Sequence, residues 1–196
     1  MLFNAQSRLN THSMAARLLA GAAIFMSALL PVTAAHAAGL DGFLSGFRAC
    51  DYADEGDPFE RFVHSLAERY GNPFTDAPAR AAERAEVAIV VPPELASAIG
   101  RPKSQNQGDH TLVTVPLKGS FGGLAVSRLE FAFGNENGIN AATLVFSASR
   151  ADVVKAFGAS VARGNKKGEE QGQDGAGYSA EIPTEEPGRI LCDWST

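Results

Sequence analysis

Two cysteines are the residues of this 196-residue sequence best suited to form a covalent bond. Cys50 and Cys192 are the only two, and they lie near opposite ends of the part of the chain after residue 37. They are too far apart for a C-x-x-C redox pair, and no cluster of Cys and His suggests a zinc site. Because exported chains usually join their cysteines, we predict a Cys50–Cys192 disulfide. In the loop-entropy model such a long loop contributes roughly 5 kcal/mol, less any strain.

Two histidines follow residue 37, and either one would be needed for a hydrolase with a histidine base. His64 lies on the polar side of a predicted helix, and His110 follows a polar loop at the start of a predicted strand. The sequence contains no G-x-S-x-G motif that would supply a nucleophile beside them. We interpret both histidines as surface residues. The alternative is an envelope hydrolase that uses His110 or His64 with a carboxylate.

Neither a metal site nor a cofactor loop is indicated by the motifs. The acidic run 50–60 has the composition of a calcium loop, but its carboxylates do not follow the D-x-[DN]-x-[DN]-G spacing. The glycine-rich run 119–123 is not followed by G-K-[ST], which a phosphate-binding loop requires. We therefore predict no metal, no cofactor and no catalytic residue.

The first 37 residues have the pattern of a secretory signal peptide. Arg8 and Arg17 precede or border an apolar run at 18–30, Pro31 follows that run, and Ala-His-Ala occupies 35–37. The apolar run is shorter than the roughly 20 residues of a membrane span. We predict cleavage after Ala37, with Met1 and Met14 as alternative starts. The product would be a single soluble domain, 38–196, in the periplasm or secreted, without a membrane anchor.

Charge and length restrict the class of this domain. Removing residues 1–37 leaves 15 basic and 22 acidic residues, a formal net charge of −7. This balance argues against nucleic acid or an anionic membrane surface as a partner, because both require a concentration of Lys and Arg. The length suffices for one domain with a substantial apolar core.

The clearest predicted element is a helix over 57–71. Asp57 is a favourable N-cap, Pro58 suits the first helical position, and Glu60 completes a capping-box pattern. Apolar residues recur from Phe59 to Tyr70 at helical spacing and form one stripe. A second helix is predicted over 149–158, with Ser149 and Asp152 at its start.

Strand patterns occupy most of the remaining domain. A hairpin is indicated by Asn-Gly within 135–138, between apolar alternations. Neighbouring strands with tight turns favour antiparallel pairing. The sequence predicts an α+β fold, an antiparallel sheet of four to six strands with two helices packed on one face, as a single domain closed by one disulfide. The predicted strands are 86–91, 111–119, 124–134, 139–148, 178–183 and 189–194.

One glycine-rich stretch, 163–177, is predicted to be a flexible loop because it has five glycines and almost no apolar side chain. Together with the acidic segment 51–57, it is the expected contact surface. The leading hypothesis for function is a non-catalytic periplasmic binding module, inhibitor-like or otherwise specific for a protein partner. A small-ligand carrier with an apolar cavity between helices and sheet is a further alternative, beside the hydrolase.

Overall fold

The computed structural model describes residues 38–51, 56–71, 85–135, 138–172 and 177–195. The predicted signal peptide, residues 1–37, lies outside the described residues. The positions 52–55, 72–84, 136–137, 173–176 and 196 lie outside them as well.

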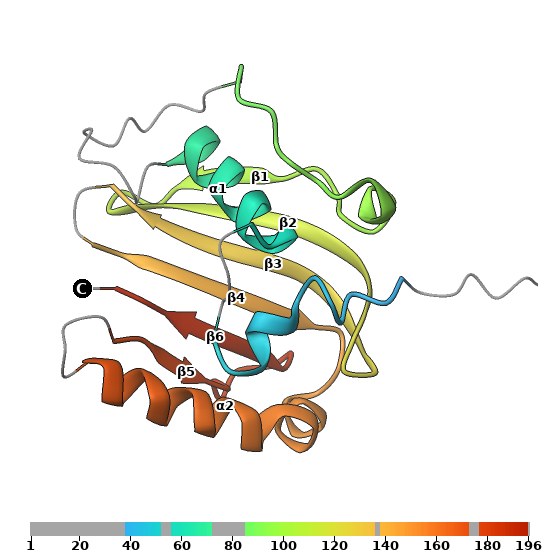
Figure 1. Cartoon of the computed structure of the whole chain (residues 1–196), viewed down its shortest axis with the longest axis vertical. Coiled ribbons are helices and arrows are strands. Elements are labelled where there is room, and N and C mark those ends of the chain that lie inside the picture. The colour runs from blue at the N-terminus through green and yellow to red at the C-terminus, as the bar shows by residue number, and fades with distance from the viewer. Residues whose placement is uncertain (1–37, 52–55, 72–84, 136–137, 173–176, 196) are drawn as a thin grey trace, which may run out of the picture. The chain divides into compact units, whose positions relative to one another are not determined.

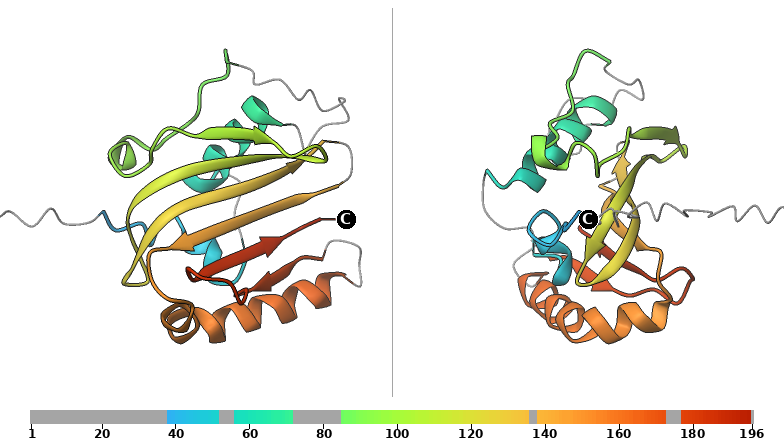
Figure 2. Two further views of the ribbon diagram at one scale, coloured as in Figure 1. Left: turned by 180° about the vertical axis from the view of Figure 1, so that it is seen from behind. Right: turned by 90° about the vertical axis from the view of Figure 1, so that its right-hand side faces the viewer.

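The described strands form one antiparallel sheet in the order β1-β2-β3-β4-β6-β5 (Figure 1). The two longer helices pack on the same face of this sheet, with α2 along its β5 edge (Figure 2). The predicted α+β fold, with an antiparallel sheet and two helices on one face, is therefore confirmed. The strands are β1 (Lys103–Asn106), β2 (His110–Phe121), β3 (Leu124–Gly134), β4 (Asn140–Phe146), β5 (Ser179–Glu181) and β6 (Arg189–Asp193).

The helices begin at the residues that the capping patterns indicate. Asp57 Oδ1 accepts a hydrogen bond from the N–H of Phe59 at 2.6 Å, and Glu60 accepts one from the N–H of Gly56 at 2.6 Å. Ser149 Oγ accepts the N–H of Asp152 at 3.2 Å, as predicted for the second helix. No helix in the described ranges is long and apolar enough to cross a bilayer. The helices are η1 (Ser45–Arg48), α1 (Pro58–Tyr70), η2 (Pro93–Leu95) and α2 (Arg150–Gly172).

Phenylalanine rings fill the space between the helices and the sheet. Phe62 of α1 contacts Phe131 of β3 with ring centroids 6.4 Å apart. Phe157 of α2 stacks on Phe121 of β2 at 5.0 Å. All four side chains are at most 2% exposed, and burying each contributes about 1.5–3 kcal/mol. Because rings occupy this space, the small-ligand carrier gains no support from it.

The predicted disulfide is confirmed. Cys50 and Cys192 are bonded with a Cα–Cα distance of 5.4 Å, and both are buried. Cys192 pairs in register with Ala142 on the face of the sheet that the helices cover. Cys50 follows η1, so the bond fixes the segment that precedes α1 to β6, the strand next to the β5 edge of the sheet.

The predicted flexible loop at 163–177 is wrong as far as Gly172, because residues 163–172 continue α2 for nearly three further turns. Its remaining positions 173–176 lie outside the described residues. The prediction used the number of glycines and the lack of apolar side chains, and both suggested a loop. It did not consider the spacing of the glycines, which decides the outcome here.

Gly164 and Gly168 are four residues apart, so they lie on one face of α2. A Cβ at Gly164 would overlap the backbone of Ala49, and a Cβ at Gly168 would overlap the backbone carbonyl of Tyr178. The absence of side chains therefore lets α2 lie directly against two backbone segments. One of these adjoins Cys50, so the glycine face also packs against the disulfide region.

Residues 86–91, predicted to be a buried strand, form an irregular segment beside α1. Their backbone is bound by α1 side chains instead of a neighbouring strand. Arg69 Nη1 donates to the carbonyl of Val87 at 2.9 Å, and the N–H of Val90 donates to Ser65 Oγ at 3.0 Å. Val90 remains 48% exposed. Conversely, β1 lies within residues that were predicted to form a polar loop, because its four side chains carry no apolar alternation.

The two edges of the sheet differ. At the β5 edge, α2 lies alongside, and Asn165 Oδ1 accepts the N–H of Ala180 at 3.1 Å. At the other edge all four side chains of β1 are exposed, and Lys103 pairs only inward with Thr114 of β2. The sheet therefore has one edge covered by a helix and one edge at the surface.

Candidate binding face

The face of the sheet opposite the helices carries no described helix, and we call it the outer face (Figure 2). It is formed by side chains that alternate with those of the core. Register places Thr114, Glu130 and Thr143 in one row across β2, β3 and β4. A second row joins Arg128, Val145 and Arg189 across β3, β4 and β6, and we call it the arginine row.

Strand alternation explains why polar side chains gather here. In β3, Leu129 and Phe131 are buried in the core. Successive side chains of a strand point to opposite faces, so Arg128, which precedes Leu129, and Glu130, which lies between the two, are on the outer face. In β6 the same rule applies, since Ile190 is fully buried and Arg189 lies on the outer face.

The second row has an apolar floor. Val145 is 0% exposed, yet it lies outside the core cluster because its neighbours Leu144 and Phe146 are the inward-facing ones. Arg128 and Arg189 flank it in register on the two adjoining strands. Arginine stems commonly cover apolar surface while the charged end stays near water. We conclude that the two arginine stems shield Val145.

The two arginines differ in their partners. Arg128 Nε donates to Glu130 Oε1 at 2.6 Å, and both side chains are partly exposed. Arg189 Nε is buried, and it has no hydrogen-bond partner in the described part of the chain. Buried donors in proteins are rarely left without an acceptor. Arg189 Nε is therefore the one donor described in this row that lacks a hydrogen-bond acceptor among the described residues.

Backbone interactions hold the row in place. A register irregularity between Val126 and Arg128 locally bends β3, and Ser127 Oγ donates to the carbonyl of Val145 at 3.1 Å. At the start of β6, the carbonyl of Gly188 accepts the N–H of Phe146 at 2.9 Å. These contacts fix both arginine-bearing strands to β4.

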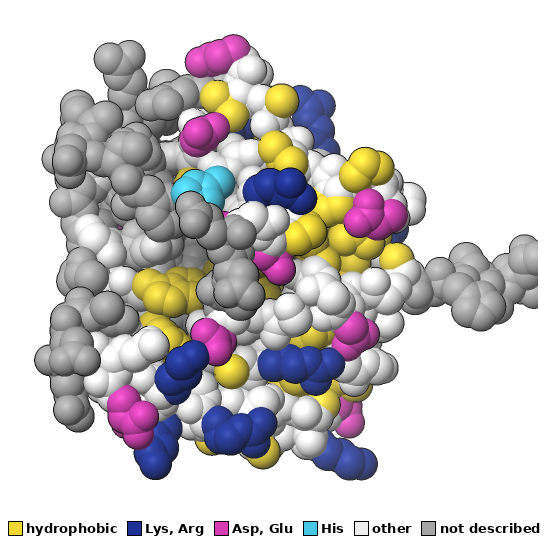
Figure 3. All heavy atoms as spheres, viewed as in Figure 1, with side chains coloured by type: hydrophobic (Ala, Val, Ile, Leu, Met, Phe, Trp, Pro, Cys, Tyr) yellow, Lys and Arg dark blue, Asp and Glu magenta, His cyan; other side chains and the backbone are white. Residues whose placement is uncertain are grey.

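The helix side of the molecule also displays many Lys and Arg side chains, mainly over α2, with acidic side chains among them (Figure 3). Several of these cations have carboxylate partners. Lys167 lies 2.7 Å from Asp51, and Lys166 lies 3.8 Å from Glu170. These pairs lower the net charge of that surface, so it is a weaker candidate for an anionic partner than the outer face.

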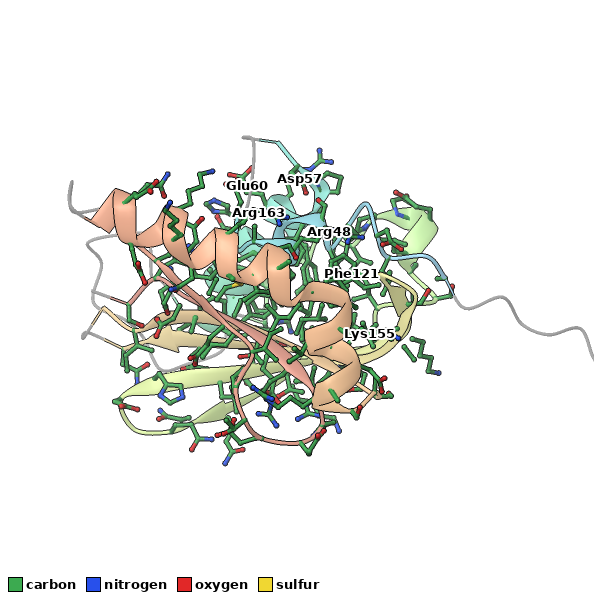
Figure 4. The ribbon with its side chains drawn as sticks, turned by 90° about the horizontal axis from the view of Figure 1, so that it is seen from below. Arg48, Asp57, Glu60, Phe121, Lys155 and Arg163 are labelled. Atoms are coloured by element: carbon green, nitrogen blue, oxygen red, sulfur yellow. A yellow bond between two sulfur atoms is a disulfide. The ribbon has the colours of Figure 1, made fainter. Side chains whose placement is uncertain are left out.

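Arg48 belongs to the same side and has a structural role (Figure 4). Its guanidinium lies 5.0 Å from the ring centroid of Phe121 and donates to Asp41 Oδ1 at 2.9 Å. Asp41 Oδ1 also accepts the N–H of Gly122 at 3.0 Å. Arg48 therefore joins η1 to the β2–β3 turn. Lys155 of α2, by contrast, points away from the body of the domain.

His110, one of the two predicted hydrolase candidates, does adjoin a carboxylate. Its Nδ1 lies 2.7 Å from Asp109 Oδ1, and this contact lowers the pKa of the Asp109 carboxyl. No hydroxyl or thiol of the described residues hydrogen-bonds to the His110 ring. The neighbouring Thr111 hydroxyl instead faces Asn135 Oδ1 at 3.5 Å. Among the described residues, the pair therefore lacks the nucleophile of a catalytic triad.

His64, the other candidate, is on the solvent side of α1 as predicted, with its side chain 57% exposed. Its Nε2 lies 3.9 Å from Glu60 Oε1, one helical turn away. His64 on α1 lies near Glu60, whereas His110 at the start of β2 lies near Asp109. No contact between described residues joins the two histidines in one site.

The predicted acidic contact segment 51–57 is described only in part. Asp51 is paired with Lys167, Asp57 caps α1, and 52–55 lie outside the described residues. Among the described residues no group of three or more His, Cys, Asp or Glu is arranged to hold a metal ion. Near the same pair, burial raises the pKa of the Tyr178 hydroxyl, for which the described residues supply no hydrogen-bond partner.

Arg189 was not recognised as a site residue from the sequence. The signal was present, because alternation in 189–194 places Cys192 and Ile190 on the core side and Arg189 opposite them. The sequence does not show which strands are adjacent in the sheet. Only the β4–β6 pairing brings Arg189 beside Val145 and within two strands of Arg128.

Comparisons with known proteins found no family model, no curated protein and no solved structure that matches this chain.

Proposed function

We propose that the chain is an exported, non-catalytic binding module whose outer face docks a protein partner. The single observation that carries the proposal is this face itself, which spans six strands, has no described helix over it and contains the incomplete arginine row. Sheets in soluble domains are often covered on one face and free on the other, so the position is available for docking.

The size of the outer face agrees with this role. Six strands at about 4.8 Å spacing extend across about 24 Å, and the strands range from about 10 Å for the three residues of β5 to about 40 Å for the twelve residues of β2. The resulting area is on the order of 600 Å², near the roughly 800 Å² that each partner buries in a standard interface.

The composition of the outer face also agrees. Thr114, Thr143 and Leu191 lie between the charged residues, in register across the central strands. Most of these side chains are only half-buried, so a partner can still cover them. Interfaces that form and dissociate have this mixed polar and apolar character.

Export is supported by one feature of the sequence and one of the structure. Residues 1–37 have the signal-peptide pattern. The buried Cys50–Cys192 disulfide is typical of an oxidising compartment. Intact mass spectrometry of the protein from its native cell is expected to show a chain that begins at Ala38. A chain that retains residues 1–37 would contradict export.

Site-specific photo-crosslinking in the native cell tests docking. A photoreactive phenylalanine derivative is placed at Thr143 on the outer face, and in a matched variant at Ala159 on the exposed side of α2. We expect a discrete crosslinked product from position 143 and none from position 159. Equal products from both positions, or a product from position 159 alone, would overturn the proposal.

A further inference from the structure

Arg189 has the features of a carboxylate-binding residue that lacks its ligand. Its Nε is buried and has no hydrogen-bond partner among the described residues. Guanidinium groups bind carboxylates most strongly through two parallel hydrogen bonds, which use Nε together with a terminal nitrogen. Arg189 as a whole is only partly buried, so a carboxylate would reach the guanidinium from its exposed side and would bond to the buried Nε only after a small movement of the side chain.

The surroundings favour binding. Val145 beneath the row is fully buried and supplies an apolar floor, and charge-assisted hydrogen bonds are stronger where water is partly excluded. Arg128 lies on the other side of Val145, about two strand spacings or roughly 10 Å from Arg189. Its charge adds to the attraction for an anion that is placed over Val145.

The charge of the cluster indicates the kind of anion. Arg128 and Arg189 carry two positive charges, and Glu130 carries one negative charge and holds Arg128 Nε at 2.6 Å. The sum favours a ligand with one negative charge. A phosphate dianion would lie near the Glu130 carboxylate and be repelled by it.

On this basis we propose that the Arg128–Val145–Arg189 row binds one acidic side chain, a Glu or Asp, of the docking protein. This inference rests on the proposed function and identifies the contact at its centre. The negative net charge of the whole domain does not prevent it, because at physiological salt charges beyond about 8 Å are largely screened.

Nuclear magnetic resonance of the arginine Nε–Hε groups tests the row with defined probes. The disulfide-intact domain is titrated with hexaglutamate, with hexaglutamine as the uncharged control and with inorganic phosphate as the competing anion. We expect hexaglutamate to move the Arg189 Nε–Hε signal saturably. Hexaglutamine is expected to leave it unchanged, and phosphate to bind at least fivefold more weakly than hexaglutamate.

Substitutions separate the row from general attraction between charges. Arg189→Gln is expected to weaken hexaglutamate binding tenfold or more, and Arg189→Lys about fivefold, because lysine keeps the charge and loses the paired donors. Lys118→Gln removes a charge from an exposed position of β2 and is expected to change binding by less than twofold. Glu130→Gln is expected to strengthen binding severalfold. It also provides a test if the Arg189 variants do not fold.

Three outcomes would overturn the proposal: no movement of the Arg189 signal, equal losses in Arg189→Gln and Lys118→Gln, or tighter binding of phosphate than of hexaglutamate. Failure of these experiments with an intact crosslink from Thr143 would leave the docking function in place and remove the arginine row from it. Hexaglutamate binding without any crosslink from Thr143 would instead leave an anion site without a protein partner.

Discussion

The two faces of the sheet are built from the same strands and differ in almost every other property. The inner face presents Phe121, Phe131 and Phe146, all buried and in contact with other aromatic rings or with the helices. The outer face presents Thr143 and Glu130 at the neighbouring positions of the same strands, and both are partly exposed. Stability therefore resides mainly on the inner face.

Substitutions are expected to be tolerated better on the outer face of the sheet than on the inner face. A residue on the inner face is held by several rings, whereas its neighbour on the outer face contacts mainly adjacent strands. The outer face can therefore acquire binding residues at little cost to folding. Arg189 shows this, since it is the first residue of β6 and the next residue, Ile190, is fully buried.

The largest expected effect compares the two faces directly. Phe131→Ala removes a ring that contacts Phe59, Phe62 and Phe133, and it should lower the free energy of unfolding by about 3–5 kcal/mol. Thr143→Ala on the outer face should change it by at most about 0.5 kcal/mol. Chemical denaturation of both variants measures the two values. Similar losses would show that the outer face contributes to stability as much as the inner face.

The disulfide is expected to have the second-largest effect. The double substitution Cys50→Ala and Cys192→Ala opens a loop with a sequence separation of 142 residues. Removing such a bond usually costs about 2–5 kcal/mol. Thermal unfolding should therefore occur at a lower temperature, while the hexaglutamate affinity of the still-folded variant stays within twofold. A large change in that affinity would mean that the two faces are coupled.

The glycine face of α2 supplies the third comparison, within one helix. Gly164→Ala places a Cβ against the backbone of Ala49, which cannot move without shifting the disulfide region, so a loss of about 1–3 kcal/mol is expected. Gly158→Ala is the control, because its Cβ would meet only Val154 Cγ1 at 3.5 Å. It should gain about 0.5–1 kcal/mol from helix propensity. The opposite order would contradict the close packing of α2.

Tyr178 gives the smallest effect and a characteristic dependence on pH. Its hydroxyl has no hydrogen-bond partner in the described part of the chain, so Tyr178→Phe should change stability by at most about 0.5 kcal/mol at pH 7. Burial raises the pKa of this hydroxyl above its usual value of 10.0. The unfolded chain then loses its proton first, and stability falls as pH rises from the unfolded pKa through the folded pKa. Denaturation between pH 9 and 11 should show a shallower fall for the variant.

Much of the fold follows from local patterns in the sequence. Asp57, Pro58 and Glu60 identify the start of α1, and the alternation around Phe131 identifies β3. These signals succeed because capping and alternation depend on neighbours within a few residues. The disulfide was also predictable, because only one pairing of two cysteines exists.

The errors come from contacts between distant residues. The glycines of 163–172 favour a loop when only the sequence is considered, whereas in the structure the backbones of Ala49 and Tyr178 lie against two of them. The apolar segment 86–91 resembles a strand, but Ser65 and Arg69 of α1 bind its backbone. The arginine row was missed for the same reason, because strand order is a tertiary property. No expectation from the sequence placed Arg189 beside Val145.

The unequal edges of the sheet limit how copies of this protein can associate through backbone pairing. Growth of a sheet into a fibre needs two open edges on every copy, one for the copy before and one for the copy after. Here α2 and the Asn165 side chain occupy the β5 edge, which leaves β1 as the exposed end. Two copies that join through β1 would consume both exposed ends, so polymerisation by strand addition stops at a pair.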